Sequence, residues 1–124
     1  MLIRFRKHPV ALVCDIAEMY LRIEVAPKER PYLRFLWRSQ EKEKEPEEFK
    51  FNGVVFGVNS SPFQAQLVAQ VNAKKDKDKL PIATETVLKS TYMDDSMDFV
   101  ADDNQALELY SQLDKLWSRA GMRA

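Results

Sequence analysis

The pattern of apolar and polar positions predicts short strands in the first half of the chain. Residues 9–15, Pro-Val-Ala-Leu-Val-Cys-Asp, form a continuous apolar run that ends in a carboxylate, which is typical of a strand buried on both faces. Aromatic-rich segments predict two more strands at 32–37 and 49–56, the latter with Phe49, Phe51 and one of Val54 and Val55 facing the core. Between them, 41–48 has no apolar member, so we expect a solvated hairpin tip.

A helix is predicted to follow these strands. Residues 61–64, Ser-Pro-Phe-Gln, combine a Ser N-cap, a Pro at the first helical position and a Gln that completes a capping box. The helix should run towards Ala73, and the polar run 74–79, closed by Pro81, is interpreted as a solvated loop. The expected core-facing stripe has apolar residues at i, i+4 and i+8: Phe63, Leu67 and Val71.

The last third of the chain predicts a hairpin and a second helix. Strand-like pieces at 87–93 and 97–100 flank a turn composition, Asp94-Asp95-Ser96. From Asp103 to a stop at Gly121, apolar residues recur at helical spacing, and Asp102 with Gln105 supplies a cap. The expected apolar face comprises Ala106, Leu109, Tyr110, Leu113, Leu116, Trp117 and Ala120. The order of elements predicts an α+β fold, an antiparallel sheet with helices packed on one face.

Composition and charge narrow the class of protein. The chain has 124 residues, 45% hydrophobic and 31% charged, which fits one folded domain, or part of one, and excludes a disordered chain. Nineteen basic and nineteen acidic residues cancel, yet residues 82–124 carry four basic against eight acidic side chains. A single cysteine, no apolar run of membrane-spanning length and no signal-peptide pattern at 1–6 predict a cytoplasmic or nuclear protein that is neither secreted nor membrane-bound.

Three aspartates are candidates for chemistry. Asp15, Asp94 and Asp95 lie at predicted strand ends or turns beside apolar residues, where a carboxylate needs water, a cationic side chain or a metal ion. Oxygen ligands without His or Cys favour a hard cation such as Mg²⁺. The plainer interpretation is a hairpin turn that favours Asp at 94–95 and an ordinary helix cap at Asp15.

Three segments carry a resemblance to a known family. Residues 15–20, Asp-Ile-Ala-Glu-Met-Tyr, resemble the first catalytic motif of reverse transcriptases, 56–63 resemble the second, and Tyr-Met-Asp-Asp at 92–95 resembles the third. The chain therefore resembles the palm domain of a long-terminal-repeat retrotransposon polyprotein, and 33–38 with 56–65 are most similar to the BEL/Pao type. On this resemblance, residues 1–124 are a partial reverse transcriptase domain with truncated fingers and no thumb.

The resemblance implies an RNA-directed DNA polymerase, a nucleotidyltransferase that adds deoxynucleotides to a primer 3′-hydroxyl with two Mg²⁺ ions, or Mn²⁺ as a substitute. Asp15 and Asp94 would bind the ions, with support from Asp95 and the main-chain carbonyl of Ile16. The implied partners are an RNA or DNA template with its primer, deoxynucleoside triphosphates, and the rest of the polyprotein: fingers, thumb and ribonuclease H.

The resemblance also assigns nucleotide and primer contacts. Tyr20 would exclude a 2′-hydroxyl, and Phe56 with Gly57 would lie against the incoming nucleotide. Tyr92 and Met93 would contact the primer terminus. Without the motifs, these residues have a plainer interpretation as core packing and a strand-end turn.

Two other interpretations remain open at the level of sequence. The chain could be an inactive retroelement remnant that acts at most as a binding or scaffold domain. It could also be a small metal-binding α+β domain unrelated to polymerases, in which case Asp15 and Asp94, 79 residues apart in sequence, would lie far apart. For a palm fragment we expect exposed apolar surface where fingers and thumb would pack.

Overall fold

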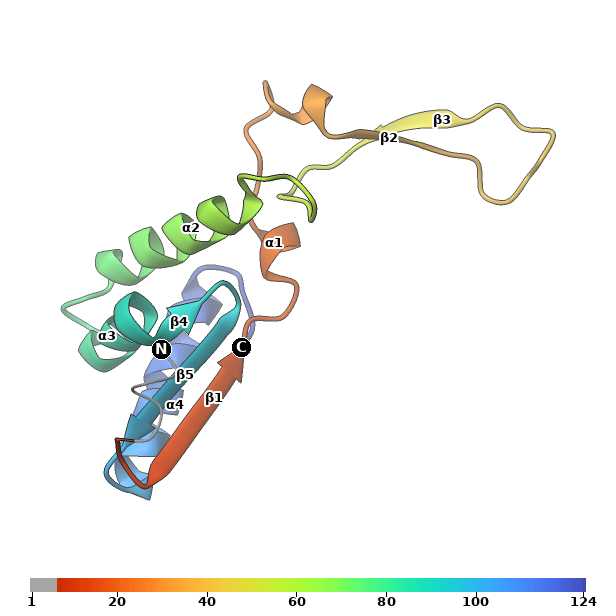
Figure 1. Ribbon diagram of the computed structural model, residues 1–124. Coiled ribbons are helices and arrows are strands. Elements are labelled where there is room, and N and C mark those ends of the chain that lie inside the picture. Colours follow the sequence, from red (N-terminus) through yellow and green to blue (C-terminus); the bar gives the residue numbers. More distant parts are fainter. Residues whose placement is uncertain (1–6) are drawn as a thin grey trace.

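The computed structural model describes residues 7–124 and has an α+β architecture (Figure 1). The elements in chain order are β1 (Val10–Asp15), α1 (Met19–Arg22), the 3₁₀ turn η1 (Arg30–Tyr32), β2 (Arg34–Trp37), β3 (Glu47–Lys50), α2 (Ser61–Lys75), α3 (Pro81–Ser90), β4 (Thr91–Tyr92), β5 (Asp95–Val100) and α4 (Asp103–Arg119). The predicted α+β class with antiparallel pairing is confirmed.

The strands form two separate antiparallel sheets. One has the order β1-β5-β4, with Val10 opposite Val100 and Asp15 opposite Asp95. The other is the β2–β3 pair, which projects away from the helices as a long arm (Figure 1). All eight arm strand residues are exposed, so the arm adds nothing to the core.

The core lies between the three-stranded sheet and the helices. Leu12 and Cys14 of β1 and Val100 of β5 share one sheet face and pack against it. The predicted amphipathic helix α4 supplies four of the five largest fully buried side chains of the core: Leu109, Leu113, Leu116 and Trp117. Tyr110, expected on the same face, is exposed because it lies at the margin of the apolar stripe.

The start of α4 is capped as predicted. The Asp102 carboxylate accepts a hydrogen bond from the Gln105 main-chain N–H (2.9 Å), and the Gln105 side chain accepts one from the Ala101 N–H (3.3 Å). At the other end Gly121 has φ 70°, the left-handed conformation that favours glycine after a helix.

The prediction of a strand at 87–93 is wrong for residues 87–90. Residues up to Ser90 belong to α3, and β4 is only two residues long. Pro81 starts α3, and Ala83, Val87 and Ser90 are buried at helical spacing. The β-branched residues of this segment favoured a strand, but its buried positions follow the helical period.

The face of α2 that meets the core is also different from the prediction. Phe63, Leu67 and Val71 are 69%, 46% and 45% exposed, whereas the buried stripe is Ser61, Ala65, Ala69 and Ala73. Small side chains let the helix backbone approach its neighbours closely, and the helix continues to Lys75, into the segment expected to be loop.

The N-cap of α2 lies one residue earlier than predicted. The N-cap is Ser60, whose hydroxyl accepts a hydrogen bond from the Gln64 side chain (2.9 Å). Ser61, the predicted cap, is buried inside the first turn and donates its hydroxyl to the Val55 carbonyl (2.6 Å).

The predicted strand at 49–56 is shifted towards the N-terminus. It begins at Glu47, inside the segment expected to be a hairpin tip, and ends at Lys50. Phe49 and Phe51 are exposed, contrary to expectation, because they lie on the arm rather than over the core. Val54 is buried as expected, in the segment that returns from the arm to α2.

Within residues 7–124, no helix is both long enough and apolar enough to cross a membrane.

Candidate functional site

The end of β1 and the β4–β5 turn bring the three candidate aspartates together. Asp15 is directly opposite Asp95 in the register, and the Ile16 N–H donates to the Asp94 carbonyl (3.0 Å). Side chains that are opposite each other in an antiparallel pair point to the same face, with Cβ atoms about 5 Å apart. The expectation that Asp15 and Asp94 lie far apart, which belongs to the interpretation as an unrelated metal-binding domain, is therefore wrong.

The turn that carries Asp94 has an unusual backbone. Met93 has φ 55°, in the left-handed region that few non-glycine residues occupy. Because Tyr92 pairs with Asp95, Met93 and Asp94 form a two-residue hairpin loop, the length that favours turns with positive φ at the first central residue. This conformation is disfavoured for Met, so other contacts must stabilise it.

Two side chains from other elements hold this turn. Gln66 of α2 accepts a hydrogen bond from the Met93 N–H (3.0 Å) and donates one to the Thr91 carbonyl (3.3 Å). Tyr20 of α1 donates its hydroxyl to the Met93 sulfur at 3.7 Å. The segments resembling the first and third motifs, and the helix that follows the second, thus meet at Met93.

A buried hydroxyl network anchors the same hairpin to α3. The Thr91 and Ser96 hydroxyls are 2.7 Å apart, and Thr91 also donates to the Thr86 carbonyl (3.3 Å). The Thr86 hydroxyl donates to the Asp98 carboxylate (2.6 Å). Since Ser96 is fully buried, its pairing with Thr91 avoids an unsatisfied polar group beneath the turn.

Among the described residues, the three candidate carboxylates have no cationic partner at ion-pair distance. Asp15 is exposed and Asp94 and Asp95 are half-buried, and within residues 7–124 none of them forms an ion pair with Lys, Arg or His. Neighbouring like charges favour water or an added cation between them. In the described part of the chain, no three Asp, Glu, His or Cys side chains, these aspartates included, are grouped closely enough to hold a metal ion.

The main-chain carbonyl of Ile16, expected to complete a metal site, lies next to Asp15 in a buried residue. It accepts a hydrogen bond from the Met19 N–H at 3.3 Å, which uses one of its two lone pairs.

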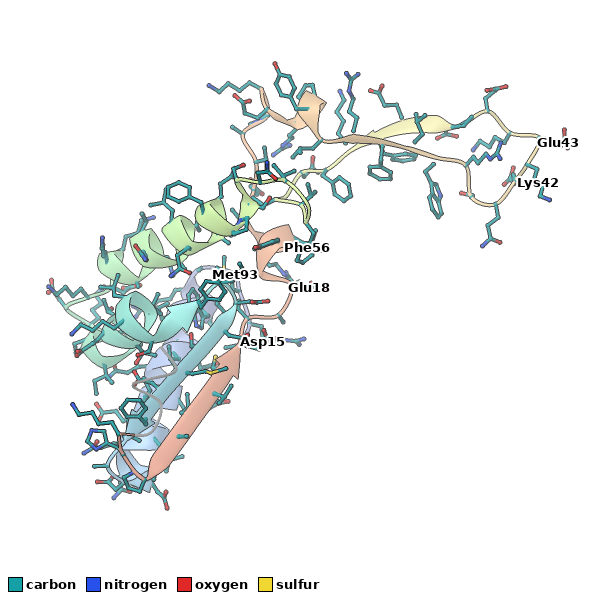
Figure 2. All side chains as sticks on the ribbon, in the orientation of Figure 1. Asp15, Glu18, Lys42, Glu43, Phe56 and Met93 are labelled. Carbon is teal, nitrogen blue, oxygen red and sulfur yellow. The ribbon has the colours of Figure 1, made fainter. Side chains whose placement is uncertain are left out.

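The predicted nucleotide residues flank the turn. Tyr20 is buried with its ring 4.7 Å from that of Phe56, which is largely exposed. Figure 2 shows Phe56 and Met93 at the end of the sheet where Asp15 lies. Gly57 has φ 85°, and a Cβ atom added there would meet open space. This position therefore favours glycine because of its backbone conformation and not because a side chain would clash. Tyr92, the predicted primer contact, is exposed.

Sequence reasoning missed Gln66, because the predicted core stripe of Phe63, Leu67 and Val71 leaves Gln66 off the core face of the helix and gives it no role. The alanine stripe of α2 was the available signal, because Gln66 lies one residue after Ala65 and so borders that buried face. Choosing the large apolar residues as the core face put Gln66 on the wrong side.

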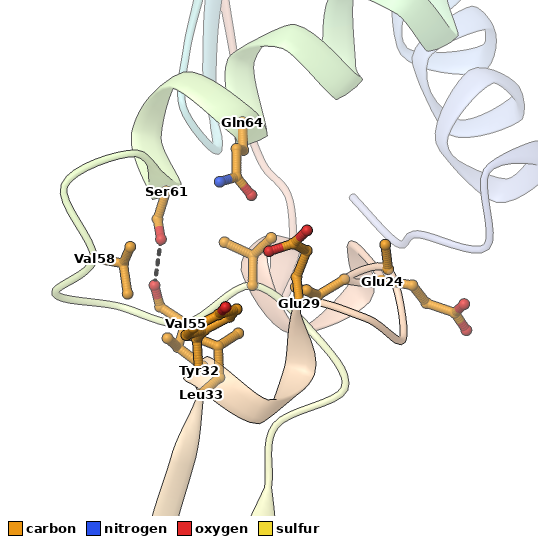
Figure 3. Close-up of a pocket in the computed structure, with 11 residues that line it drawn as sticks. Glu24, Glu29, Tyr32, Leu33, Val55, Val58, Ser61 and Gln64 are labelled. Carbon is orange, nitrogen blue, oxygen red and sulfur yellow. Dashed lines mark hydrogen bonds between the residues drawn. The ribbon is translucent and has the colours of Figure 1, made fainter.

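A separate cavity lies between the base of the arm and the start of α2 (Figure 3). Its volume is about 480 Å³, and its lining includes Glu24, Glu29, Tyr32, Ser61 and Gln64. None of the three candidate aspartates lines it, so it is distinct from the carboxylate site.

No protein-family model matches this chain, and no curated protein shows a significant sequence match to it. The resemblance to reverse transcriptases therefore stays a prediction.

We predict that Gln66→Leu exposes the Met93 amide to exchange. The substitution removes the acceptor of the Met93 N–H. The free energy of the opening that exposes this amide to hydrogen exchange should therefore fall by about 1 kcal/mol. Gln70→Leu, one turn further along the same helix, is the matched control and should leave Met93 unchanged. Equal protection of Met93 in both variants would show that Gln66 does not hold the turn.

The thiol of Cys14 reports on the charge of Asp15. Burial raises the pKa of Cys14, and the negative charge of Asp15 raises it further. We predict that Asp15→Asn lowers this pKa and speeds alkylation of Cys14 by iodoacetamide at pH 8, because more thiolate is present.

The alkylation rate of Cys14 should increase less in Asp15→Asn than it does when the chain is unfolded in urea. Burial contributes more than Asp15 to the raised pKa of this thiol, and only unfolding removes the burial. The rate of modification of this single cysteine, followed by mass spectrometry, measures the effect. Asp78→Asn, with an exposed side chain, should not change the rate. An unchanged or slower rate in Asp15→Asn would contradict the coupling.

Proposed function

We propose that this chain is the catalytic palm part of an RNA-directed DNA polymerase that adds deoxynucleotides to a primer 3′-hydroxyl. The observation that carries the proposal is the register of β1 and β5, which sets Asp15 opposite Asp95 and places Asp94 in the adjoining turn. The order and spacing of the three sequence motifs add to it.

The donor set suits a pair of hard divalent cations. Asp15, Asp94 and Asp95 offer carboxylate oxygens at one end of a sheet, and no cationic side chain in residues 7–124 neutralises them. Asp15 and Asp94 would hold the ions, with Asp95 and the Ile16 carbonyl in support. Bound Mg²⁺ or Mn²⁺ would supply activation of the primer hydroxyl and neutralisation of triphosphate charge.

Tyr20 is suited to selecting the sugar of the nucleotide. Its ring contacts Phe56, and its hydroxyl is engaged by Met93, so its orientation is fixed from two sides. A rigid aromatic ring beside the carboxylates would clash with a 2′-hydroxyl more effectively than a mobile one. Gly57 leaves open space in which a nucleotide can approach the backbone.

The proposal includes the partners that such a palm requires: an RNA or DNA template with a primer, deoxynucleoside triphosphates, and the fingers, thumb and ribonuclease H of a retrotransposon polyprotein of the BEL/Pao type. Phosphate contacts to the template would be sequence-independent and sensitive to salt. The alternative is an inactive retroelement remnant that keeps the palm geometry without cation binding and serves as a binding or scaffold domain.

Titration with Mn²⁺ and Mg²⁺ separates these two functions. We predict calorimetrically detectable binding to the chain that Asp94→Asn weakens at least about tenfold, since losing a direct ligand should cost no less than losing an outer-shell partner. Asp78→Asn, which removes an exposed carboxylate after the end of α2, is the matched control and should bind as the unaltered chain does.

Binding that is equal in both variants, or no binding by the unaltered chain, would refute the metal site. Metal binding sensitive to Asp94, together with primer extension in the presence of template and deoxynucleotides, would support the polymerase, whereas a folded chain that binds no cation would favour the inactive remnant.

A further inference from the structure

The arm formed by β2 and β3 has two chemically different faces. Phe35 is opposite Phe49 in the register, and the Phe35 ring lies 5.6 Å from that of Phe49 and 4.8 Å from that of Phe51. Trp37 follows on the same face of the ribbon by the two-residue alternation of a strand. These four exposed rings, Phe35, Trp37, Phe49 and Phe51, are called the aromatic face here.

The far end of the arm is acidic. Residues 41–48 contain five glutamates and two lysines, and Figure 2 shows Lys42 and Glu43 at the outer tip. Lys44 pairs with Glu47 and Arg34 with Glu48, whereas Glu41, Glu43 and Glu45 form no ion pair within residues 7–124. The aromatic face therefore leads into a tip with uncompensated negative charge.

The outer side of α2 has the complementary pattern. The exposed residues Phe63, Leu67 and Val71 form an apolar stripe that leads to the exposed Lys74 and Lys75. Beside this stripe runs a groove of about 570 Å³, called the α2 groove here. Its lining includes Leu67, Val71, Lys75, Trp117 and Arg119.

The groove is mostly apolar and carries a cation at its end. Arg22 and Arg119 line it, but they are already paired with the carboxylates of Glu18 and Asp76. Lys75, the last residue of α2, also lines it and forms no ion pair within residues 7–124. A ligand with an apolar face and an acidic end would match this lining, because its apolar area would leave water and its negative charge would meet the lysine.

The dimensions of the two surfaces agree. From Leu33 to Trp37 the arm extends about 14 Å at strand spacing, and from Phe63 to Lys75 the helix extends about 18 Å at 1.5 Å per residue. The arm cannot reach its own α2 groove, because it projects in the direction opposite to the C-terminal end of α2 (Figure 1). The matching occupant is the arm of another molecule.

We propose that two copies of this chain associate by exchanging arms, each laying its aromatic face and acidic tip into the α2 groove of the other. Such a contact is isologous, so one complementary pair of surfaces is used twice. A nucleic acid is a poorer occupant of the aromatic face, because the glutamates of the tip repel phosphates. The association goes beyond the proposed polymerase function and requires no metal ion.

Exchange of charges tests the contact. One variant reverses the tip, Glu43→Lys with Glu45→Lys, and a second reverses the groove end, Lys74→Glu with Lys75→Glu. All four positions are exposed, and circular dichroism checks that both variants are folded. We expect dimer mass for the unaltered chain by light scattering, and dissociation at least about tenfold easier for each variant alone, because like charges then face each other.

An equimolar mixture of the two variants should regain dimers, since both arm–groove contacts then join opposite charges. Monomer mass for the unaltered chain, dimers in either variant alone, or a mixture that stays monomeric would each overturn the proposal.

A matched pair of apolar substitutions tests the aromatic face separately. Trp37→Ser removes a ring from this face, and Leu36→Ser removes a somewhat more exposed apolar side chain from the opposite face of the same strand. Only Trp37→Ser should weaken dimerisation. Equal weakening by both, or by neither, would exclude the aromatic face as the contact.

Discussion

The antiparallel pairing of β1 with β5 is the contact on which the rest of the structure depends. It joins the first strand of the described chain to the last one and fixes Asp15 opposite Asp95. A slip of one residue would turn Asp15 towards the helices and Cys14 towards the open face. The register is held by burial, because Leu12, Cys14 and Val100 pack against the core on one side.

The hairpin next to this pair shows how local strain is maintained. Met93 keeps a left-handed backbone because Gln66, Tyr20 and the hydroxyls beneath it constrain the turn. Residues in disfavoured conformations cluster at functional sites, where surrounding contacts over-determine them. The strained residue thus occurs at the same end of the sheet as the three carboxylates, which form no ion pair with any residue of 7–124.

Parts of this arrangement could be predicted from sequence because local patterns determine them. The continuous apolar run of β1 and the amphipathic period and cap of α4 each depend on neighbours in sequence. The predicted turn at 94–96 is correct only in part, because the loop is Met93–Asp94, and Asp95 and Ser96 belong to β5. The proximity of Asp15 to Asp95 follows from the placement of both residues at strand ends in one sheet.

Other parts depend on long-range packing that no local pattern expresses. The buried face of α2 is set by close approach over Ala65 and Ala69 rather than by its large apolar residues. Phe63 and Leu67 stay on the surface for that reason, and the arm's rings do so because the arm lies away from the core. The role of Gln66 depends on which face of α2 is buried. It could not be inferred before that face was known.

The central claim is that Asp15, Asp94 and Asp95 converge to hold divalent cations. A crystal of the chain grown with Mn²⁺ and measured for anomalous scattering at the manganese edge tests it most directly. The account predicts anomalous peaks between Asp15 and the β4–β5 turn, within about 2.0 to 2.6 Å of carboxylate oxygens. A difference map without manganese at this position, in crystals where the chain is otherwise ordered, would contradict it.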